Sequence, residues 1–221
     1  MSSTASLDGS YEDSLANEKS DLVSTQQYKD QSLQWIDKYE TDMMENSNYT
    51  EPRHVVKAFV ELGLDRQSRI LDILAGSGVV AEMLRPCGYT NIDAIDASKE
   101  MLALANKKQL YKKFYVSLLG GQHKAPVHDE TYDAIIASGT FAPGHLNSDA
   151  FGDLIRIAKP GAIITWSMRS DYGSSAPKFA NFDAEVEDLV KNGVWRHHVP
   201  RRTIEPYLLG SDGYIYTMKK I

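Results

Sequence analysis

A carboxylate followed by closely spaced small residues gives the chain its first candidate ligand site. The stretch RILDILAGSGVVAEML, residues 69–84, passes from apolar residues through Asp72 into a run of small residues, Ala75, Gly76, Ser77 and Gly78. Glycine adopts backbone conformations that other residues avoid, and it lets a ligand approach the main chain closely. The stretch therefore predicts a strand, a tight ligand-binding loop and the start of a helix.

The glycine loop by itself fits two classes of ligand. The spacing of Gly76, Gly78 and Ala81 matches the fingerprint G-x-G-x-x-(G/A), which leaves a NAD-dependent Rossmann oxidoreductase as one alternative. Asp72 favours a cationic group, such as an α-amino group, over a pyrophosphate. Asp96, in IDAIDAS, ends the next predicted strand, where its oxygens can accept hydrogen bonds from ribose hydroxyls. Together these residues favour a nucleoside that carries an amino acid.

The elements that must hold this loop alternate between strand-like and helix-like patterns. Strands are expected at 69–74, 91–96, 113–119, 132–138 and 162–168, with a closing pair at 195–209 and 213–220. Such alternation predicts a parallel sheet covered on both faces. We expect an α/β fold: a Rossmann-like, doubly wound, mostly parallel seven-stranded sheet with an antiparallel C-terminal hairpin strand and N-terminal lid helices. Ligands bind such sheets beyond the carboxyl ends of the strands.

Composition sets limits on domains and partners. The 221 residues, 42% of them hydrophobic, suffice for one domain. We expect a disordered acidic tail over 1–24, poor in large apolar groups, and one domain over 25–221 with a helical lid at 25–48. The net charge of −6 disfavours a nucleic acid partner. The single Cys87 and the lack of a transmembrane-length apolar run predict a cytoplasmic protein without membrane association. We expect a monomer or a homodimer.

Four segments resemble the motifs of class I S-adenosylmethionine-dependent methyltransferases. ILDILAGSG looks like the first motif, D-x-x-x-G-x-G, and IDAIDASKEML is similar to the second. YDAIIASGTF resembles the fourth strand, and RIAKPGAIITWS the turn before the fifth. The resemblance covers about 28–221 and implies S-adenosyl-L-methionine as cofactor. It implies a cofactor site of lid aromatic residues and core residues: Tyr28, Trp35, Tyr39, Asp72, Ala75, Gly76, Ser77, Gly78, Asp96, Ala97, Met101, Leu118, Leu119, Ser138 and Gly139.

A closer resemblance is to the methyltransferase-like proteins named after the Williams–Beuren syndrome chromosomal region. The segments WIDKYETD at 35–42, LLG at 118–120 and NGVW at 192–195 are similar to theirs. Two features depart from the wider family pattern. VSLLGGQ lacks the acidic residue that often faces the adenine amino group, so adenine is expected to rest on Leu118 and Leu119. Ala162 replaces the last glycine of the L-K-P-G-G turn.

The implied chemistry is in-line transfer of a methyl group to a small-molecule acceptor, which requires alignment of the nucleophile and exclusion of water. His145, in SGTFAPGHL after the fourth predicted strand, is the candidate general base for an acceptor that carries a proton. Phe141, Arg169 and Tyr172 follow strands at the same edge and are candidate substrate-binding residues. No metal-ligand spacing is visible. A protein-methylating or partner-binding member of the fold is a further alternative, which the acidic surface permits.

Overall fold

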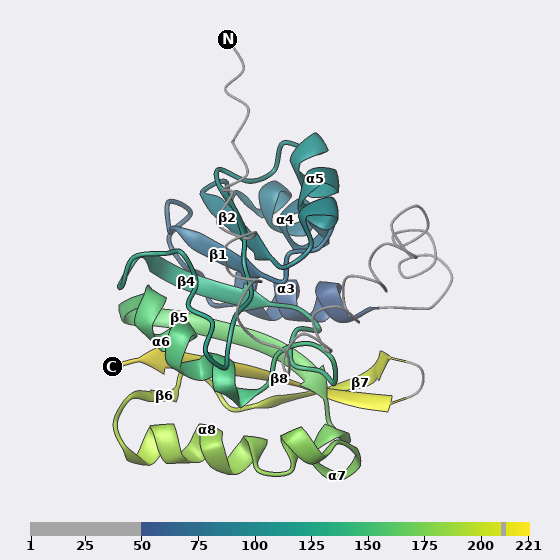
Figure 1. The fold of residues 1–221 in the computed structure, drawn as a ribbon, viewed down its shortest axis with the longest axis vertical. Coiled ribbons are helices and arrows are strands. Elements are labelled where there is room, and N and C mark those ends of the chain that lie inside the picture. Colours follow the sequence, from purple (N-terminus) through teal and green to yellow (C-terminus); the bar gives the residue numbers. More distant parts are fainter. Residues whose placement is uncertain (1–49, 209–210) are drawn as a thin grey trace.

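The structure is a computed structural model, and it describes residues 50–208 and 211–221 (Figure 1). The expectations for 1–24 and for the lid at 25–48, with Tyr28, Trp35 and Tyr39, lie outside these residues. The helices are α3 (Glu51–Glu61), α4 (Val79–Leu84), α5 (Lys99–Lys107), α6 (Phe151–Ile157), α7 (Tyr172–Ser175) and α8 (Phe182–Lys191), with short 3-10 turns at Arg85–Cys87, Ser148–Ala150 and Pro177–Phe179.

The strands form one sheet in the order β3-β2-β1-β4-β5-β8-β6, with β7 also paired to β8. Strands β1 to β5 run parallel, and β8 runs antiparallel to its three neighbours. Chain order reverses between β1 and β4, as in a doubly wound sheet. The expected α/β class, a Rossmann-like, mostly parallel sheet with an antiparallel C-terminal strand, is confirmed. The strand bounds are β1 (Ile70–Ile73), β2 (Ile92–Asp96), β3 (Phe114–Val116), β4 (Tyr132–Ala137), β5 (Ala158–Arg169), β6 (Trp195–His197), β7 (Arg202–Leu208) and β8 (Ser211–Lys220).

Over the described residues the sheet has eight strands in seven positions, one strand more than expected. The segment expected to form one strand at 195–209 is divided into β6 and β7, which pair with different halves of β8. Pro200 lies between them and has no backbone N–H to donate to a ladder, which accounts for the break.

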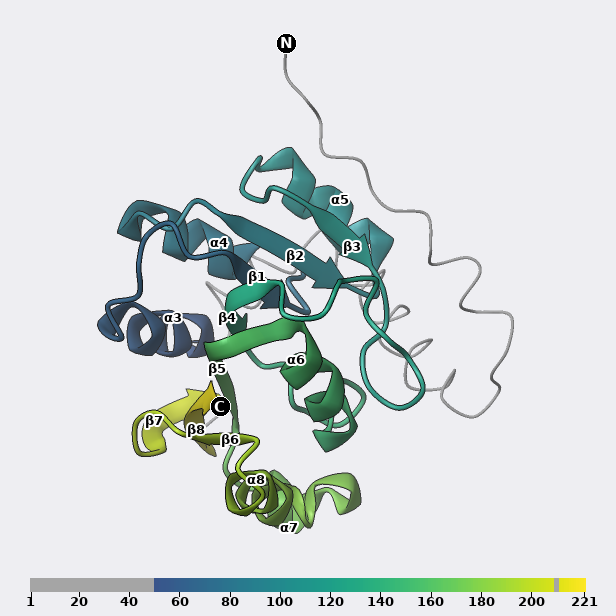
Figure 2. The same cartoon turned by 90° about the vertical axis from the view of Figure 1, so that its left-hand side faces the viewer.

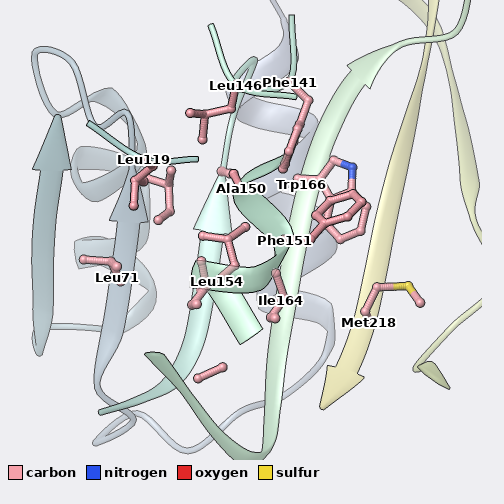
Figure 3. Close-up of a cluster of buried hydrophobic side chains, with 14 of the residues drawn as sticks. Leu71, Leu119, Phe141, Leu146, Ala150, Phe151, Leu154, Ile164, Trp166 and Met218 are labelled. Carbon is pink, nitrogen blue, oxygen red and sulfur yellow. The ribbon is translucent and has the colours of Figure 1, made fainter. Parts of the chain in front are cut away.

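Alternation along the strands divides the core between the two faces of the sheet. In β1, Ile70 packs with residues of α3, α4 and α5, whereas Leu71 and Ile73 pack with residues of α6 and α8. Figure 2 shows α3, α4 and α5 on one side of the sheet and α6 on the other. An aromatic group around Phe151 and Trp166 forms much of the second core (Figure 3). Both faces are thus filled, and the carboxyl ends of the strands are left to carry the site. Within 50–208 and 211–221 no helix is long and apolar enough to cross a membrane.

Candidate functional site

The loop after β1 depends on residues in the left-handed backbone region. Gly76 has φ +54° and Gly78 has φ +94°, and Leu74 adopts φ +50° between the strand and the glycines. A Cβ atom on Gly78 would lie 3.2 Å from the ring of Tyr111. Glycine at this position is therefore required twice, by the backbone conformation and by the close approach of the tyrosine.

Asp96 connects the glycine loop to the turn after β2. Its Oδ2 accepts a 2.9 Å hydrogen bond from the Gly76 amide, and its Oδ1 accepts a 2.7 Å bond from the Ser98 amide. The residue is 0% exposed. Ser98 in turn caps α5, since its Oγ accepts a hydrogen bond from Met101 N. Asp96 thus fixes two backbone segments; each carboxylate oxygen has more than one lone pair, so these bonds are compatible with the expected contact to a ribose.

Asp72 is buried beneath the same loop. It is 1% exposed, and its Oδ2 accepts a 2.6 Å hydrogen bond from the Tyr111 hydroxyl. Burial raises the pKa of Asp72 to about 7; the Tyr111 hydrogen bond opposes the rise and the charge of Asp96 adds to it. A cationic group beside Asp72 would favour its ionised form.

Two oxygen atoms of the loop region have no hydrogen-bond partner among the residues that the structure describes. They are Asp72 Oδ1 and Ser77 Oγ, and both are buried. A buried polar atom that is left unpaired costs about 1–3 kcal/mol. A carboxylate and a hydroxyl oxygen that both lack a donor fit a ligand bearing several N–H donors, such as an ammonium group.

The remaining core residues expected at the cofactor lie at the same edge of the sheet. Ile73 of β1 is in register with Ile95 of β2 and with Ala137 of β4, so these strands end at one level. The residues that follow are gathered there: Ala97, Met101 and Leu119 are buried, and Leu118, Ser138 and Gly139 are half-buried. The structure thus brings together the described members of the predicted site.

His145 lies in the loop that follows β4. Its Nδ1 is 3.4 Å from the carbonyl oxygen of Gly139. The residue is exposed, and desolvation lowers the pKa of His145 while the contact with Gly139 opposes the shift. A neutral imidazole at pH 7 is the form that can accept a proton.

Two expected substrate-binding side chains are engaged elsewhere. Phe141 is 1% exposed, and its ring centroid lies 5.3–5.6 Å from those of Phe151, Trp166 and Phe182 (Figure 3). Its size and apolarity place it in the core, so the described structure does not present Phe141 to a substrate. The Arg169 guanidinium donates two hydrogen bonds to the Asp171 carboxylate and one to Ser211 Oγ.

Arg169 is therefore already paired, and its charge is neutralised without an anionic substrate. Tyr172, the third expected substrate residue, is half-buried, with its ring 5.5 Å from that of Phe179 and 5.4 Å from the Arg169 guanidinium. It lies at the ligand-bearing edge beyond β5, where it was predicted.

Sequence reasoning missed two residues of this edge. Tyr111 lies in KKQLYKKF, a basic segment typical of a surface connection, and nothing local indicates its contact with Asp72. Glu51 begins α3, where an acidic residue usually lies exposed near the helix N-terminus. It is instead buried, and its Oε1 accepts hydrogen bonds from Ser138 and Ser167. Among the described residues there is no cluster of His, Cys, Asp and Glu that could hold a metal ion.

Comparison with known proteins agrees with this geometry. Residues 70–161 match a family described as a methyltransferase domain. Human methyltransferase-like protein 27 is 28% identical over 163 residues, which are 73% of this chain and 65%, less than two thirds, of that protein. A SAM-dependent methyltransferase from Aquifex aeolicus superposes with a TM-score of 0.54 at 24% identity, over 77% of this chain and 90% of that one.

The [4+2]-cyclase SpnF has a similar fold, with a TM-score of 0.57 and 15% identity over 76% of this chain and 84% of that one. At these identities the structural likeness shows the fold alone, and SpnF illustrates why the reaction must be argued from the site. The family match covers 70–161, less than half of the chain, and proteins of that family use S-adenosylmethionine as cofactor. The unpaired oxygens of Asp72 and Ser77 fit the amino-acid end of that molecule.

Proposed function

We propose that this chain is an S-adenosylmethionine-dependent methyltransferase that methylates a small-molecule acceptor by in-line transfer. The observation that carries the proposal is the pair Asp72 and Asp96. They lie on the adjacent strands β1 and β2, before and after the glycine loop in sequence, and β1 borders the point where strand order reverses. When bound, the cofactor supplies an activated methyl group on a sulfonium, so the protein has mainly to orient the acceptor and exclude water.

Each part of the edge has a role in this proposal. Asp72 and Ser77 receive the ammonium group, since their unpaired oxygens accept hydrogen bonds. Asp96 holds the Gly76 amide in place and accepts hydrogen bonds from the ribose. The apolar residues after β2 and β3 provide a surface for adenine: Ala97, Met101, Leu118 and Leu119. Ser138 and Gly139, after β4, complete the proposed cofactor site on the side that borders the acceptor.

His145 is the proposed general base, needed when the acceptor starts with a proton on its nucleophilic atom. The lowered pKa keeps the ring neutral at pH 7, and the loop after β4 is the edge that faces an acceptor. The reaction forms a bond from the acceptor lone pair to the methyl carbon. The electrons of the broken bond stay on sulfur, and the acceptor proton passes to the imidazole or to water.

The finer expectations belong to this proposal as well. The human relative supports a place among the methyltransferase-like proteins of the Williams–Beuren region. We further propose a cytoplasmic protein, monomeric or homodimeric, with no nucleic acid or membrane partner. A protein substrate is the second candidate, because the net charge of −6 suits a basic protein acceptor.

Thermal shift with S-adenosylhomocysteine and with NAD tests the ligand class. Stabilisation by S-adenosylhomocysteine is expected, and stabilisation by NAD alone would support the oxidoreductase alternative and overturn the proposal. The acceptor class is tested by incubation with labelled S-adenosylmethionine, a metabolite extract and a protein extract. Label in small molecules is expected, whereas label confined to a protein band would favour the protein-methylating alternative.

A further inference from the structure

A buried carboxylate that the methyltransferase motifs do not include lies at the ends of β4 and β5. Glu51 is 1% exposed, and its Oε1 accepts a 3.2 Å hydrogen bond from Ser138 Oγ and another from Ser167 Oγ. The hydroxyl of Tyr207 hydrogen-bonds to Glu51 and to Ser167. We call Glu51, Ser138, Ser167 and Tyr207 the Glu51 cluster.

Separate parts of the chain hold this cluster together. Glu51 comes from the start of α3, Ser138 directly follows β4, Ser167 lies in β5, and Tyr207 comes from β7. Thr50 Oγ1 lies 3.5 Å from the carbonyl oxygen of Tyr207, which joins the start of α3 to β7. The Tyr207 ring occupies the space where a Cβ on Gly213 would stand, at 2.2 Å. Burying a carboxylate costs several kcal/mol, so an arrangement built around one indicates a specific use.

Strand register places the cluster next to the proposed methyl-transfer position. Ile73 is in register with Ala137, and Ala137 with Trp166. Ser138 and Ser167 are each one residue further along their strands, level with the start of the glycine loop. Ser138 is half-exposed, whereas Glu51 and Ser167 are buried. Ser138 is therefore the serine through which the cluster reaches an acceptor.

We propose that Glu51 is a positioning residue that acts through Ser138. It favours acceptors whose reacting atom carries a proton, namely amines and hydroxyls, over anionic carboxylates and thiolates. This inference rests on the proposed function. A serine hydroxyl has one proton; because Ser138 donates it to Glu51, its oxygen presents only lone pairs to the acceptor. These accept the acceptor's N–H or O–H and so leave its own lone pair free to point at the methyl carbon.

The charge of Glu51 gives the same preference. In a buried setting a carboxylate acts on its neighbours with little screening. It repels an anionic acceptor and stabilises the positive charge that develops on an amine nitrogen during methyl transfer. A hydroxyl group in place of Glu51 would retain polarity without this discrimination.

The test compares two cofactor analogues by calorimetry, so it needs no identified acceptor. Sinefungin carries a protonated amine where the cofactor carries its methyl group, and S-adenosylhomocysteine carries nothing there. The wild-type protein should bind sinefungin more tightly than S-adenosylhomocysteine. Glu51→Gln should reduce this preference at least tenfold while changing the affinity for S-adenosylhomocysteine less than threefold.

Glu61→Gln is the matched control, since it makes the same change at the exposed end of the same helix. It should keep the wild-type preference. Ser138→Ala keeps the carboxylate but removes the hydroxyl that faces the acceptor, so it should also lose the preference for sinefungin. This variant provides the test if Glu51→Gln does not fold. An unchanged preference in either folded variant would overturn the inference while leaving the proposed function in place. Failure of the wild type to bind either compound would overturn both.

Discussion

The hydroxyl of Tyr111 donates a 2.6 Å hydrogen bond to Asp72 Oδ2, across 39 residues of sequence. The same ring lies against Gly78, where a Cβ atom would come within 3.2 Å of it. One side chain therefore contacts the glycine loop and also opposes the rise that burial causes in the pKa of Asp72. Tyr111 couples the shape of the proposed cofactor site to its charge.

Tyr111→Phe should destabilise the protein by about 1–3 kcal/mol, because it leaves Asp72 Oδ2 buried without a donor. The hydrogen bond from Tyr111 favours the ionised form of Asp72, so its loss should raise the pKa of Asp72 further. S-adenosylhomocysteine should then bind more weakly at pH 7. Tyr89→Phe is the matched control: Tyr89 belongs to the same core, and its hydroxyl donates to Leu64 O. It should lower stability but leave binding unchanged; equal binding by both variants would contradict the coupling.

The raised pKa of Asp72 predicts a pH-dependent affinity. The group has its ordinary pKa of 3.8 when unfolded and about 7 when folded, so the folded state binds more protons between these values. Stability from this group is present at low pH and is lost as pH rises from about 4 to about 7. An ammonium ligand favours the ionised form. Affinity for S-adenosylhomocysteine should therefore increase up to about pH 7, with proton release on binding.

Calorimetry in buffers of different ionisation enthalpy measures that proton release directly. Asp72→Asn keeps the shape but cannot ionise, so its affinity should stay near the low-pH value of the wild type and release no proton in this range. A wild-type profile that is flat between pH 5.5 and 7.5 would show that Asp72 does not face the ammonium group.

Gly78→Ala should damage the site beyond its backbone strain. An alanine at φ +94° costs roughly 1 kcal/mol, and its Cβ would also press on Tyr111. Gly193→Ala is a matched control, because Gly193 has φ +67° and nothing within 4 Å of the added Cβ. In thermal unfolding both variants should lose about the same stability through backbone strain. Gly78→Ala alone should lose further stability and bind S-adenosylhomocysteine more weakly. Equal effects would argue against the contact with Tyr111.

Gly213→Ala and Gly152→Ala should change stability in opposite directions. A Cβ on Gly213 would stand 2.2–2.9 Å from atoms of Tyr207, and the tyrosine must then leave the Glu51 cluster at a cost of about 1–3 kcal/mol. Gly152 is exposed in α6 with nothing within 4 Å, so alanine should stabilise the helix by roughly 0.5–1 kcal/mol. Chemical denaturation measures both; a neutral Gly213→Ala would contradict the position of Tyr207.

The sequence determined the sheet and the edge that carries the site. Alternating strand and helix patterns decide element type locally, and parallel strands necessarily end at one edge, which is why Asp72, Gly76 and Asp96 could be predicted to lie together. The division of 195–209 into β6 and β7 was not predicted, because its strand-like pattern runs on both sides of Pro200.

Only the tertiary structure decided which groups are paired. Asp72 meets Tyr111 across 39 residues, and Glu51 meets Ser167 across 116. Phe141 and Arg169 follow strands at the edge expected to bind substrate. Phe141 is instead buried in the core, and Arg169 forms an ion pair with Asp171. Such pairings depend on which distant segments come together in the folded chain. Hydrophobic periodicity indicates only the local element type, so it does not predict these contacts.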